Sequence, residues 1–536
     1  MQIKIRKTNK RIRVASAVRL ILLIVLILSA LSEMLFFFSI PNLLGCVMAI
    51  VAFYLYSRFV LSERNIVERP FSFFAMTTLF LYRFLCLPAT LLEGHPISFM
   101  MVVPEQTFPL EILLYLFIIA SFVSSKGNSN RNNWFVTNLR TTGLYAPPSN
   151  GVLWALGFIG LYASIFQRSV HGIEYGDVLS KFIVGFAYLQ YAPLLILFNR
   201  LTHRGDSQSE RSLVYIYILL LLYLGIGSNS RQQMLYSVGT IALLWFLDAV
   251  VKKRTIRSFA SFGYVLMAIL AVFMLNAFSD FSDAMLYNRK IRADVTYSEL
   301  IERTFDTYND DELMTKIRNE RHESFQEAEG AMVVAEKWDE TYIDNFMLNR
   351  YCNVRITDAT LNLANKLEWP NSIMQADYLQ RLIILLPTPV INFLGIRLDK
   401  NDLSNSRGDF LYALANNQRV FASYRVTSSL ADGLATFGWW YFGVQFILYW
   451  LIFKLLDSLT CVVNGVRYYS PLGLLSVFAY FGKTRNGGTG CINDASFLLR
   501  SFWQSLILYL VVMYVANIFA KSQKAKLRTV SNVQKE

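Results

Sequence analysis

The sequence predicts an all-α, polytopic integral membrane protein with about twelve transmembrane helices and one long polar stretch. Hydrophobic residues make up 54% of the 536 residues and charged residues only 17%, whereas a soluble domain carries about 25% charged residues. The mean hydropathy is +0.37, and several apolar runs reach the roughly 20 residues that cross a hydrocarbon core of ~30 Å. These observations exclude an ordinary soluble domain.

The apolar runs divide into nine expected spans before the polar stretch and three after it. The first run follows a basic N-terminus and is too long for a signal peptide, so we expect it to stay as an uncleaved span. The eleventh run is the shortest of the twelve. The expected spans cover residues 18–40, 43–61, 71–92, 108–124, 151–167, 182–198, 212–227, 233–250, 258–277, 434–456, 470–482 and 501–520.

The basic residues of the short loops predict the orientation of these spans. Lys and Arg are enriched in cytoplasmic loops, and placing the N-terminus inside also places five further basic clusters inside. We therefore expect a multi-pass protein of the cytoplasmic (inner) membrane with both termini cytoplasmic. Its membrane parts are expected at 1–277 and 431–520, with a long extracytoplasmic (periplasmic) loop at 278–430 and a basic cytoplasmic tail at 521–536.

Net charge separates the long loop from the rest of the chain. Residues 278–430 carry 17 Lys and Arg against 23 Asp and Glu, a formal charge of −6. The whole chain carries +13, so the remainder carries +19. A basic membrane part suits anionic lipid, and no zinc-finger spacing or basic-aromatic platform points to nucleic acid. The expected partner is the lipid bilayer.

Within the long loop, apolar residues at helical spacing predict three helices. These cover Glu327 to Thr341, Arg355 to Leu367 and Asp409 to Tyr424. The apolar run Leu382 to Val390 is too short to span a membrane. We expect that run to lie in the membrane interface or to pack beneath the loop.

The five cysteines are scattered along the chain. Cys352 and Cys491 both fall on the expected outer side, where a disulfide and two free thiols both stay open, because sequence alone does not give the Cα separation. No Cys/His spacing predicts a zinc site, so we expect no bound metal.

Arg231 is the first candidate binding residue. It lies in a polar break, Gly227 to Gln233, between two apolar runs at the expected outer boundary. A positive charge at that position runs against the orientation bias. Arg231 is either a snorkelling arginine at a helix end or a contact for an anion, which nearby Ser and Asn donors and helix-terminal N–H groups would assist.

A second cluster closes the long loop and contains Arg407, Arg419 and Arg425 with Asp409 and Asp432. Asp432 follows Arg425 by seven residues, or two helical turns, so on one helix both side chains would share a face. Guanidinium groups bind phosphate oxygens bidentately, and a carboxylate can accept a proton from a sugar hydroxyl. A structural Arg–Asp pair that fixes the helix entry is the alternative.

Arg485 opens a glycine-rich stretch in the last expected outer loop, Arg485-Asn486-Gly487-Gly488-Thr489-Gly490. Exposed N–H groups of such a turn can cradle phosphate. The spacing is not that of a Walker motif, and a plain turn is the alternative.

In layout, the chain resembles the bacterial polysaccharide repeat-unit polymerases, the O-antigen or oligosaccharide polymerases of the Wzy type. The resemblance consists of about twelve spans, both ends inside, and one long outer loop late in the chain. In sequence it is confined to the break from Gly227 to Arg231 and to the segment that contains Arg425, Ser428-Ser429, Asp432 and Phe437-Gly438.

The resemblance implies a metal-independent glycosyltransferase of the integral-membrane GT-C type, without a cofactor. It would join undecaprenyl-diphosphate-linked oligosaccharide units into O-antigen, capsule or exopolysaccharide, beside the chain-length regulator and flippase of its pathway. Fixed cations would stabilise the leaving diphosphate, with Arg231 and Arg425 first and Arg407, Arg419 and Arg485 in reserve. Asp432 or Asp409 would be the base.

Two other functions stay open. An O-antigen ligase shares the architecture and the lipid-linked donor but depends on a loop histidine, and the long loop holds only His322, among charged residues. A lipid-linked-oligosaccharide flippase would not need an outer loop of about 150 residues, and the chain has no internal repeat of the kind that many transporters carry.

Overall fold

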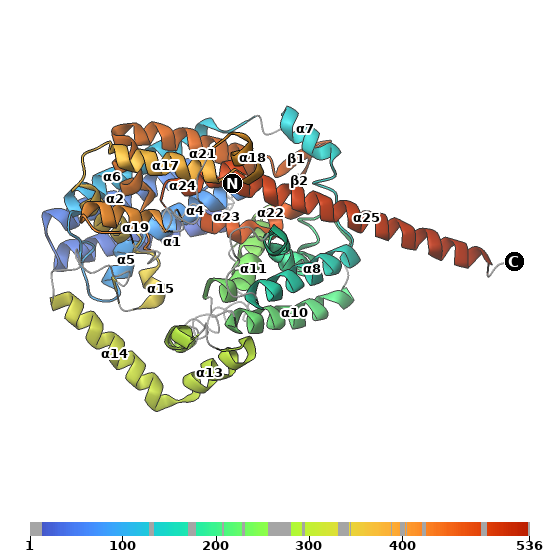
Figure 1. Cartoon of the computed structure of the whole chain (residues 1–536), viewed down its shortest axis with the longest axis horizontal. Coiled ribbons are helices and arrows are strands. Elements are labelled where there is room, and N and C mark those ends of the chain that lie inside the picture. The colour runs from blue at the N-terminus through green and yellow to red at the C-terminus, as the bar shows by residue number, and fades with distance from the viewer. Residues whose placement is uncertain are drawn as a thin grey trace, which may run out of the picture.

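The structure is a computed structural model of the 536-residue chain, and it is mostly helical (Figure 1). It describes all residues except 1–12, 128–132, 170–177, 206–207, 228–230, 256–279, 292–294, 331–341, 344, 387, 397–402, 404, 421–424, 484–489 and 534–536.

Six helical stretches among the described residues are long and apolar enough to cross a membrane. Their surfaces expose large aliphatic side chains such as Leu28, Leu31 and Leu35 of α1, which water would not favour but lipid covers. The chain is therefore a multi-pass membrane protein. The six stretches are α1 (Val14–Phe36), α2 with η1 (Ile40–Val60), α6 (Pro104–Ser124), α8 (Asn150–Ser169), α20 to α21 (Ser429–Asp457) and α24 with η6 and the start of α25 (Ile492–Ala516).

Several expected spans are divided into shorter helices. The expected span 71–92 forms α4 (Pro70–Phe84) and α5 (Cys86–Leu91), which meet at Leu85. Pro88 explains this break, because its ring clashes with the carbonyl four residues earlier in a continuous helix. The expected span 470–482 forms α22 (Pro471–Leu475) and α23 (Val477–Lys483), and the expected span 258–277 lies outside the described residues.

The middle of the chain contributes a further layer of apolar helices. It consists of α9 (Val178–Val184), η2 (Ala187–Phe198), α10 (Gln208–Gly227) and α11 (Arg231–Val251). A Cβ at Gly160 of α8 would lie 1.9 Å from the Gln190 nitrogen, and one at Gly157 would lie 2.5 Å from Pro193. These two glycines therefore let α8 and η2 pack backbone to backbone, as small residues do between membrane helices.

One end of the helix bundle carries a short β-hairpin. Strands β1 (Thr460–Val463) and β2 (Val466–Tyr469) pair antiparallel, with Thr460 opposite Tyr469. Asn464 and Gly465 form the turn, both with positive φ, as a two-residue Asn-Gly turn requires. Arg69 ties this end together by donating to Asp457 at 2.6 Å and to Ser125 at 2.6 Å. Short helices α3 (Glu63–Glu68) and α7 (Trp134–Thr141) complete it.

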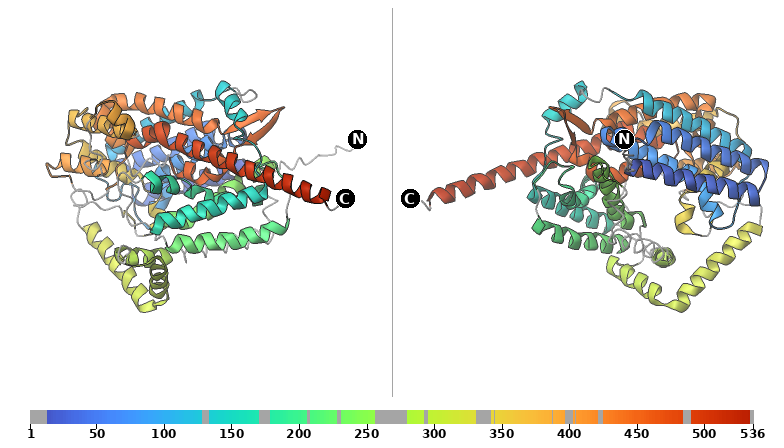
Figure 2. Two further views of the ribbon diagram at one scale, coloured as in Figure 1. Left: turned by 45° about the vertical axis from the view of Figure 1, so that its right-hand side comes forward. Right: turned by 180° about the vertical axis from the view of Figure 1, so that it is seen from behind.

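The long polar stretch divides into two structurally different halves. Its early half forms an arm of η4 (Asn288–Ile291), α13 (Tyr297–Asn309) and α14 (Asp311–Gly330) at the edge of the molecule (Figures 1 and 2). Its late half packs with α20 (Ser429–Phe437) against α4, α5 and α6 and shares the main hydrophobic core. The late half contains α15 (Phe346–Asn349), α16 (Val354–Ala364), α17 (Ser372–Ile384), α18 (Thr388–Phe393) and α19 (Arg407–Ala415).

The helices predicted in the long stretch have mixed outcomes. The helix predicted at Arg355 to Leu367 is confirmed as α16, and the helix predicted at Asp409 to Tyr424 corresponds to the shorter α19. The apolar run Leu382 to Val390 is divided between the end of α17 and the start of α18. Most of the helix predicted at Glu327 to Thr341 lies outside the described residues.

The last spanning stretch continues into α25 (Phe502–Val533), which projects beyond the rest of the molecule and ends near the C-terminus (Figure 2). The preceding helices are α24 (Ile492–Ser496) and η6 (Phe497–Ser501). Between η5 (Gly438–Trp440) and the hairpin runs α21 (Tyr441–Asp457).

Candidate functional site

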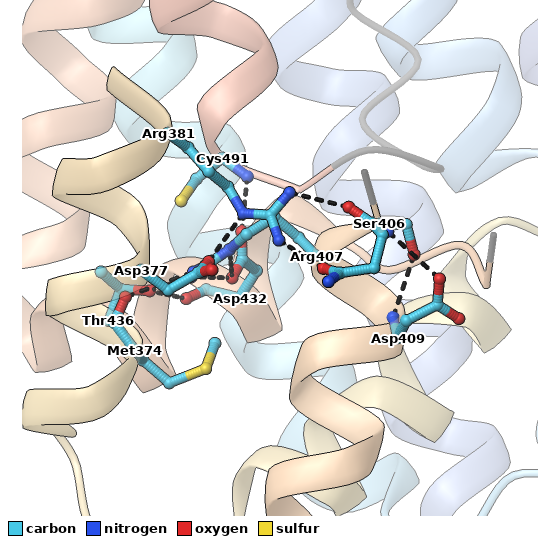
Figure 3. A network of polar contacts seen from close by, with 10 residues as sticks. Met374, Asp377, Arg381, Ser406, Arg407, Asp409, Asp432, Thr436 and Cys491 are labelled. Atoms are coloured by element: carbon cyan, nitrogen blue, oxygen red, sulfur yellow. Dashed lines mark hydrogen bonds and ion pairs between the residues drawn. The ribbon is translucent and has the colours of Figure 1, made fainter. Parts of the chain in front are cut away.

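Four buried charged residues form one network where α17, α19 and α20 meet (Figure 3). Asp377 and Arg381 come from α17, Arg407 from α19 and Asp432 from α20. None of the four is more than 8% exposed. Charges that are this deeply buried persist only when they are paired and hydrogen-bonded, and the contacts below meet that condition.

Arg407 is the centre of the network. Its Nε and Nη2 donate to Asp432 Oδ1 at 2.9 and 2.5 Å, and its Nη1 donates to Asp377 Oδ2 at 2.5 Å. Nη2 also donates to the Thr436 hydroxyl at 2.7 Å. Arg407 thus lies between two carboxylates from different helices, which fixes its side chain and joins α17, α19 and α20.

Arg381 completes the charge balance. It donates to Asp377 Oδ2 at 2.7 Å from one turn further along α17, and to both oxygens of Asn405, at 2.8 and 2.6 Å. The network therefore contains two guanidinium groups and two carboxylates. This neutral arrangement offsets part of the large cost of removing each charge from water.

The second oxygen of Asp432 reaches the chain just before α24. The Cys491 N–H donates to Asp432 Oδ2 at 2.8 Å. Gly490 has a φ of +73°, and a Cβ there would lie 2.3 Å from the same oxygen. Only glycine permits this close approach without strain, so the Asp432 carboxylate also holds the entry to the last span.

The electrostatics keep Arg407 charged. Burial alone would lower the pKa of Arg407, but the neighbouring Asp432 carboxylate and its hydrogen bonds outweigh that effect, and Asp377 adds to it. The net result is a pKa above the usual arginine value, so Arg407 stays a cation at any physiological pH.

Asp409 and Arg425 form a second, adjacent group. Asp409 is fully buried and completes a capping box with Ser406 at the start of α19, a reciprocal pair that satisfies free N–H groups. Asp409 Oδ1 also accepts the Arg425 N–H at 3.1 Å, and the Ser406 hydroxyl donates to the Arg425 carbonyl at 2.7 Å. The start of α19 therefore binds both the backbone N–H and the backbone carbonyl of Arg425.

The predicted juxtaposition of Arg425 and Asp432 on one helix is wrong. Ser428 caps α20 by accepting the Ala431 N–H, so the helix starts at Ser429 and Arg425 lies before it in an extended segment. Asp432 instead pairs with Arg407, and Arg425 lies 3.7 Å from Asp409. Both arginines of the cluster pair with aspartates, but with other partners than the spacing predicted.

Arg425, in the segment before α20, is more exposed than Arg407 of α19. Its guanidinium carbon lies 4.1 Å from the ring centroid of Tyr412, and its side chain is 22% exposed, against 1% for Arg407. Among the described residues its Nε has no hydrogen-bond partner, but that atom is itself buried. A cation that is held in place and partly exposed can bind an incoming anion at low reorganisation cost.

The remaining predicted binding residues lie elsewhere or outside the described residues. Arg419 is exposed after the end of α19. Arg231 begins α11, but its side chain is not among those described. Further along α11, Tyr236 packs on Phe478 of α23 at 4.9 Å between ring centroids. Arg485 lies outside the described residues, so the structure does not test its proposed role.

Sequence reasoning missed Asp377 and Arg381. They lie four residues apart, the spacing at which an acid and a base meet on one helix face. An isolated pair of opposite charges inside an otherwise uncharged stretch, 369–396, was the available signal. The Ser406-x-x-Asp409 spacing is likewise a capping-box pattern, which would have predicted the position of Asp409.

The other sequence candidates have structural roles in the described residues. Cys352 and Cys491 are both buried free thiols and do not pair. Among the aromatic residues, Tyr378 packs edge-on against Phe437 and lies under Arg407. No group of three His, Cys, Asp or Glu side chains gathers as potential metal ligands within the described part of the chain.

A cavity of about 160 Å³ lies at the hairpin end of the bundle, away from this network. Its lining includes Lys126, Lys454 and Arg467. Two ion pairs form among its lining residues: Arg69 binds Asp457, and Lys126 lies 4.0 Å from Glu68. The cavity contains none of the predicted site residues.

Comparison of the chain with protein-family models, with curated proteins and with solved structures found no match. The fold and the network therefore define the class only as a multi-pass, mostly helical membrane protein with a buried arginine–aspartate network. Any more specific function has to be argued from the site.

Proposed function

We propose that the chain is a metal-independent membrane glycosyltransferase that polymerises undecaprenyl-diphosphate-linked oligosaccharide units into a surface polysaccharide. In this proposal about twelve spans place both termini in the cytoplasm, with the late half of 278–430 at the outer face of the cytoplasmic membrane. The proposal combines the layout of the sequence with one structural observation.

That observation is that Arg425 is held in place by its neighbours while part of its side chain stays exposed. Its backbone is held by Asp409 and Ser406, its guanidinium lies over Tyr412, and its side chain is 22% exposed. A leaving diphosphate needs fixed positive charge, and guanidinium groups match phosphate oxygens in geometry. The neighbouring Arg407 network supports this position, because Arg407 and Asp409 are two residues apart on α19.

In the proposed reaction a sugar hydroxyl of one unit attacks the anomeric carbon of a second, lipid-linked chain. The new C–O bond forms as the bond to the diphosphate breaks, the diphosphate leaves with the bonding electrons, and the hydroxyl proton passes to a carboxylate. Asp432 and Asp409 are the candidates for that carboxylate. Asp409 lies beside the partly exposed Arg425, whereas Asp432 is enclosed by Arg407 and the Cys491 N–H.

The test is the length of the surface glycan in a strain that lacks the gene and carries a variant copy. We expect Arg425→Ala to abolish long-chain glycan while single repeat units remain, and Arg425→Lys to rescue poorly because lysine cannot bind bidentately. Arg303→Ala is the matched control, because Arg303 of α13 is 50% exposed and pairs only with Glu299 in what the structure shows.

Three outcomes would contradict the proposal. If a strain that produces correctly inserted Arg425→Ala makes full-length glycan, Arg425 is not a residue of the site. If deletion of the gene leaves long polymer on the polyprenyl carrier, the protein acts later, as a ligase does. If unpolymerised units accumulate on the cytoplasmic side, the protein acts earlier, as a flippase does.

A further inference from the structure

Helix α17 has its polarity inverted relative to a helix that faces water. Its only charged residues, Asp377 and Arg381, are buried, at 5% and 8% exposure. Its outward face instead exposes Ile373 and Leu379, the latter at 58%, together with the uncharged Ser372, Ala376 and Gln380. Soluble proteins bury apolar side chains and leave charges in water, so the solvent outside α17 is not expected to be water.

The arm helix α13 provides the contrast within the same polar stretch. It buries Leu300 and Ile301 and exposes Glu302 and Arg303. That is the usual pattern of an amphipathic helix at a water-facing surface. The two helices therefore present surfaces of different polarity, although both belong to the stretch between the ninth and tenth expected spans.

Exposed apolar side chains also lie at the end of α18 and directly after it. Phe393 is 89% exposed and Leu394 is 54% exposed. The chain from Leu382 to Ile396 contains no charged residue. Contiguous exposed apolar surface of this kind marks an interaction site in a soluble protein or a lipid contact in a membrane protein.

The neighbours of α17 belong to the membrane part. It packs beside α24, which begins the last spanning stretch, and beside α20 (Figure 1). Leu499 and Ile507 of that last stretch are exposed, at 62% and 58%. Helix α17 is therefore a neighbour of the last span, and both expose apolar side chains.

An aromatic pair lies where α17 begins. Trp439 and Trp440 are exposed, at 65% and 83%. A Cβ at the adjacent Gly438 would lie 3.3 Å from Pro370, two residues before α17. Exposed tryptophans concentrate at the boundary between lipid and water, so α17 starts at the level of that boundary.

Backbone N–H groups described at the ends of α17 and α18 are paired within the segment. The N–H groups of Leu385, Leu386, Leu394 and Gly395 all donate to carbonyls within the segment. In hydrocarbon each unsatisfied backbone group costs several kcal/mol, so this internal pairing is a condition for entering the bilayer. With 13 residues, α17 rises only about 20 Å and cannot cross it.

We propose that α17 and α18 form a helical hairpin that dips into the bilayer, with its outward face against lipid acyl chains. The hairpin covers one side of the Asp377–Arg381–Arg407–Asp432 network, so lipid lies outside it. The bilayer is the occupant favoured by the buried charges, the adjoining span and the tryptophan pair. This inference does not depend on the proposed glycosyltransferase activity.

The test uses single cysteines that carry a bimane fluorophore in proteoliposomes, since all five native cysteines are buried. Leu379→Cys and Phe393→Cys report on the hairpin. Ile507→Cys on the last span is the lipid control and Arg419→Cys is the water control, both at exposed positions. All four positions are on the surface, so the variants should fold, and size-exclusion chromatography selects those that do.

We expect the two hairpin probes to emit at shorter wavelength than the Arg419→Cys probe. They should lose emission with brominated acyl chains as the Ile507→Cys probe does, and resist aqueous iodide. Quenching by iodide to the extent of the Arg419→Cys probe would overturn the proposal in favour of water. Protection from both quenchers would overturn it in favour of a protein, or a second copy, covering this face.

Discussion

The early and late halves of the long polar stretch differ in charge, packing and solvent. Residues 278–330 carry a formal charge of −6, whereas residues 342–430 carry +2. The early half rests on the membrane part through a small cluster, in which Phe281 and Met285 contact Leu222 of α10. The late half contributes Val354, Leu361 and other residues to the main core.

This difference shows that polar composition alone does not identify a soluble domain. In the early half most of the described charges are on the surface, as in the 50% and 41% exposed pair of Arg303 and Glu299, although Asp283 is buried. In the late half the charges of the network are paired in the interior, as Arg407 is with Asp432 of α20. Net charge distinguishes the two halves, but only burial shows that the charges of the late half are paired in the interior.

The largest expected effect is loss of the buried pair that joins the late half to α20. Asp432→Ala leaves Arg407 with one carboxylate in place of two, and removing one partner of a buried ion pair costs about 3–5 kcal/mol. Its matched control in the early half is Glu299→Ala, because exposed i,i+4 pairs contribute only about 0.3–0.5 kcal/mol. Chemical unfolding of both variants in detergent measures the difference, and equal losses would contradict the contrast between the halves.

A second variant tests how the late half holds Arg425. A Cβ at Gly408 would lie 2.3 Å from the Arg425 carbonyl oxygen, whereas nothing lies within 4 Å of one at Gly443 in α21. Overpacking a tight site costs about 1–3 kcal/mol, so we expect Gly408→Ala to destabilise the protein and to shorten the glycan. Gly443→Ala should do neither. Unchanged unfolding and glycan length in Gly408→Ala would show that the start of α19 does not position Arg425.

The smallest expected effect concerns pH. Asp358 of α16 accepts the Val103 N–H at 2.9 Å and the Thr107 hydroxyl at 3.0 Å at the start of α6. Burial raises the pKa of Asp358, although these hydrogen bonds oppose the shift. The folded state therefore holds the proton more tightly than the unfolded state, so this contribution to stability is greatest below the unfolded pKa of about 3.9. It is lost as pH rises through the raised value.

Asp358→Asn removes that titration while keeping one acceptor oxygen. The difference in unfolding temperature between the native protein and Asp358→Asn should therefore change with pH in the acidic range and level off above the raised pKa. A difference that is constant across the acidic range would show that Asp358 has the same pKa in both states.

Much of the membrane part could be predicted from hydropathy, because a spanning helix is a local property of about 20 residues. Expected spans such as 18–40 and 108–124 correspond to α1 and α6. The break of the expected span 71–92 at Leu85 was also a local feature, since Pro88 marks it. The division of the long stretch was not local, because it depends on which residues pack against α4 and α6.

The candidate site was predicted in residue type but not in pairing. Arg407 and Asp432 are 25 residues apart, and Arg407 and Asp377 are 30 apart, so no helical period connects them. The one local pairing that the spacing suggested, Arg425 with Asp432, failed because Ser428 starts the helix after Arg425. The sequence shows that arginines and aspartates gather at the end of the loop. Which of them pair depends on how the helices pack, and that is not a local property.

Hydrogen exchange on the whole protein in detergent or nanodiscs tests the central claim most directly, namely that the late half belongs to the membrane body and the early half does not. Exchange reports local opening, which is rare in a shared core and frequent where few buried contacts hold a helix. We predict slow exchange for the amides of α16 and α19 and fast exchange for those of α13 and α14. Equal exchange in all four helices, or faster exchange in α16 and α19, would contradict the account.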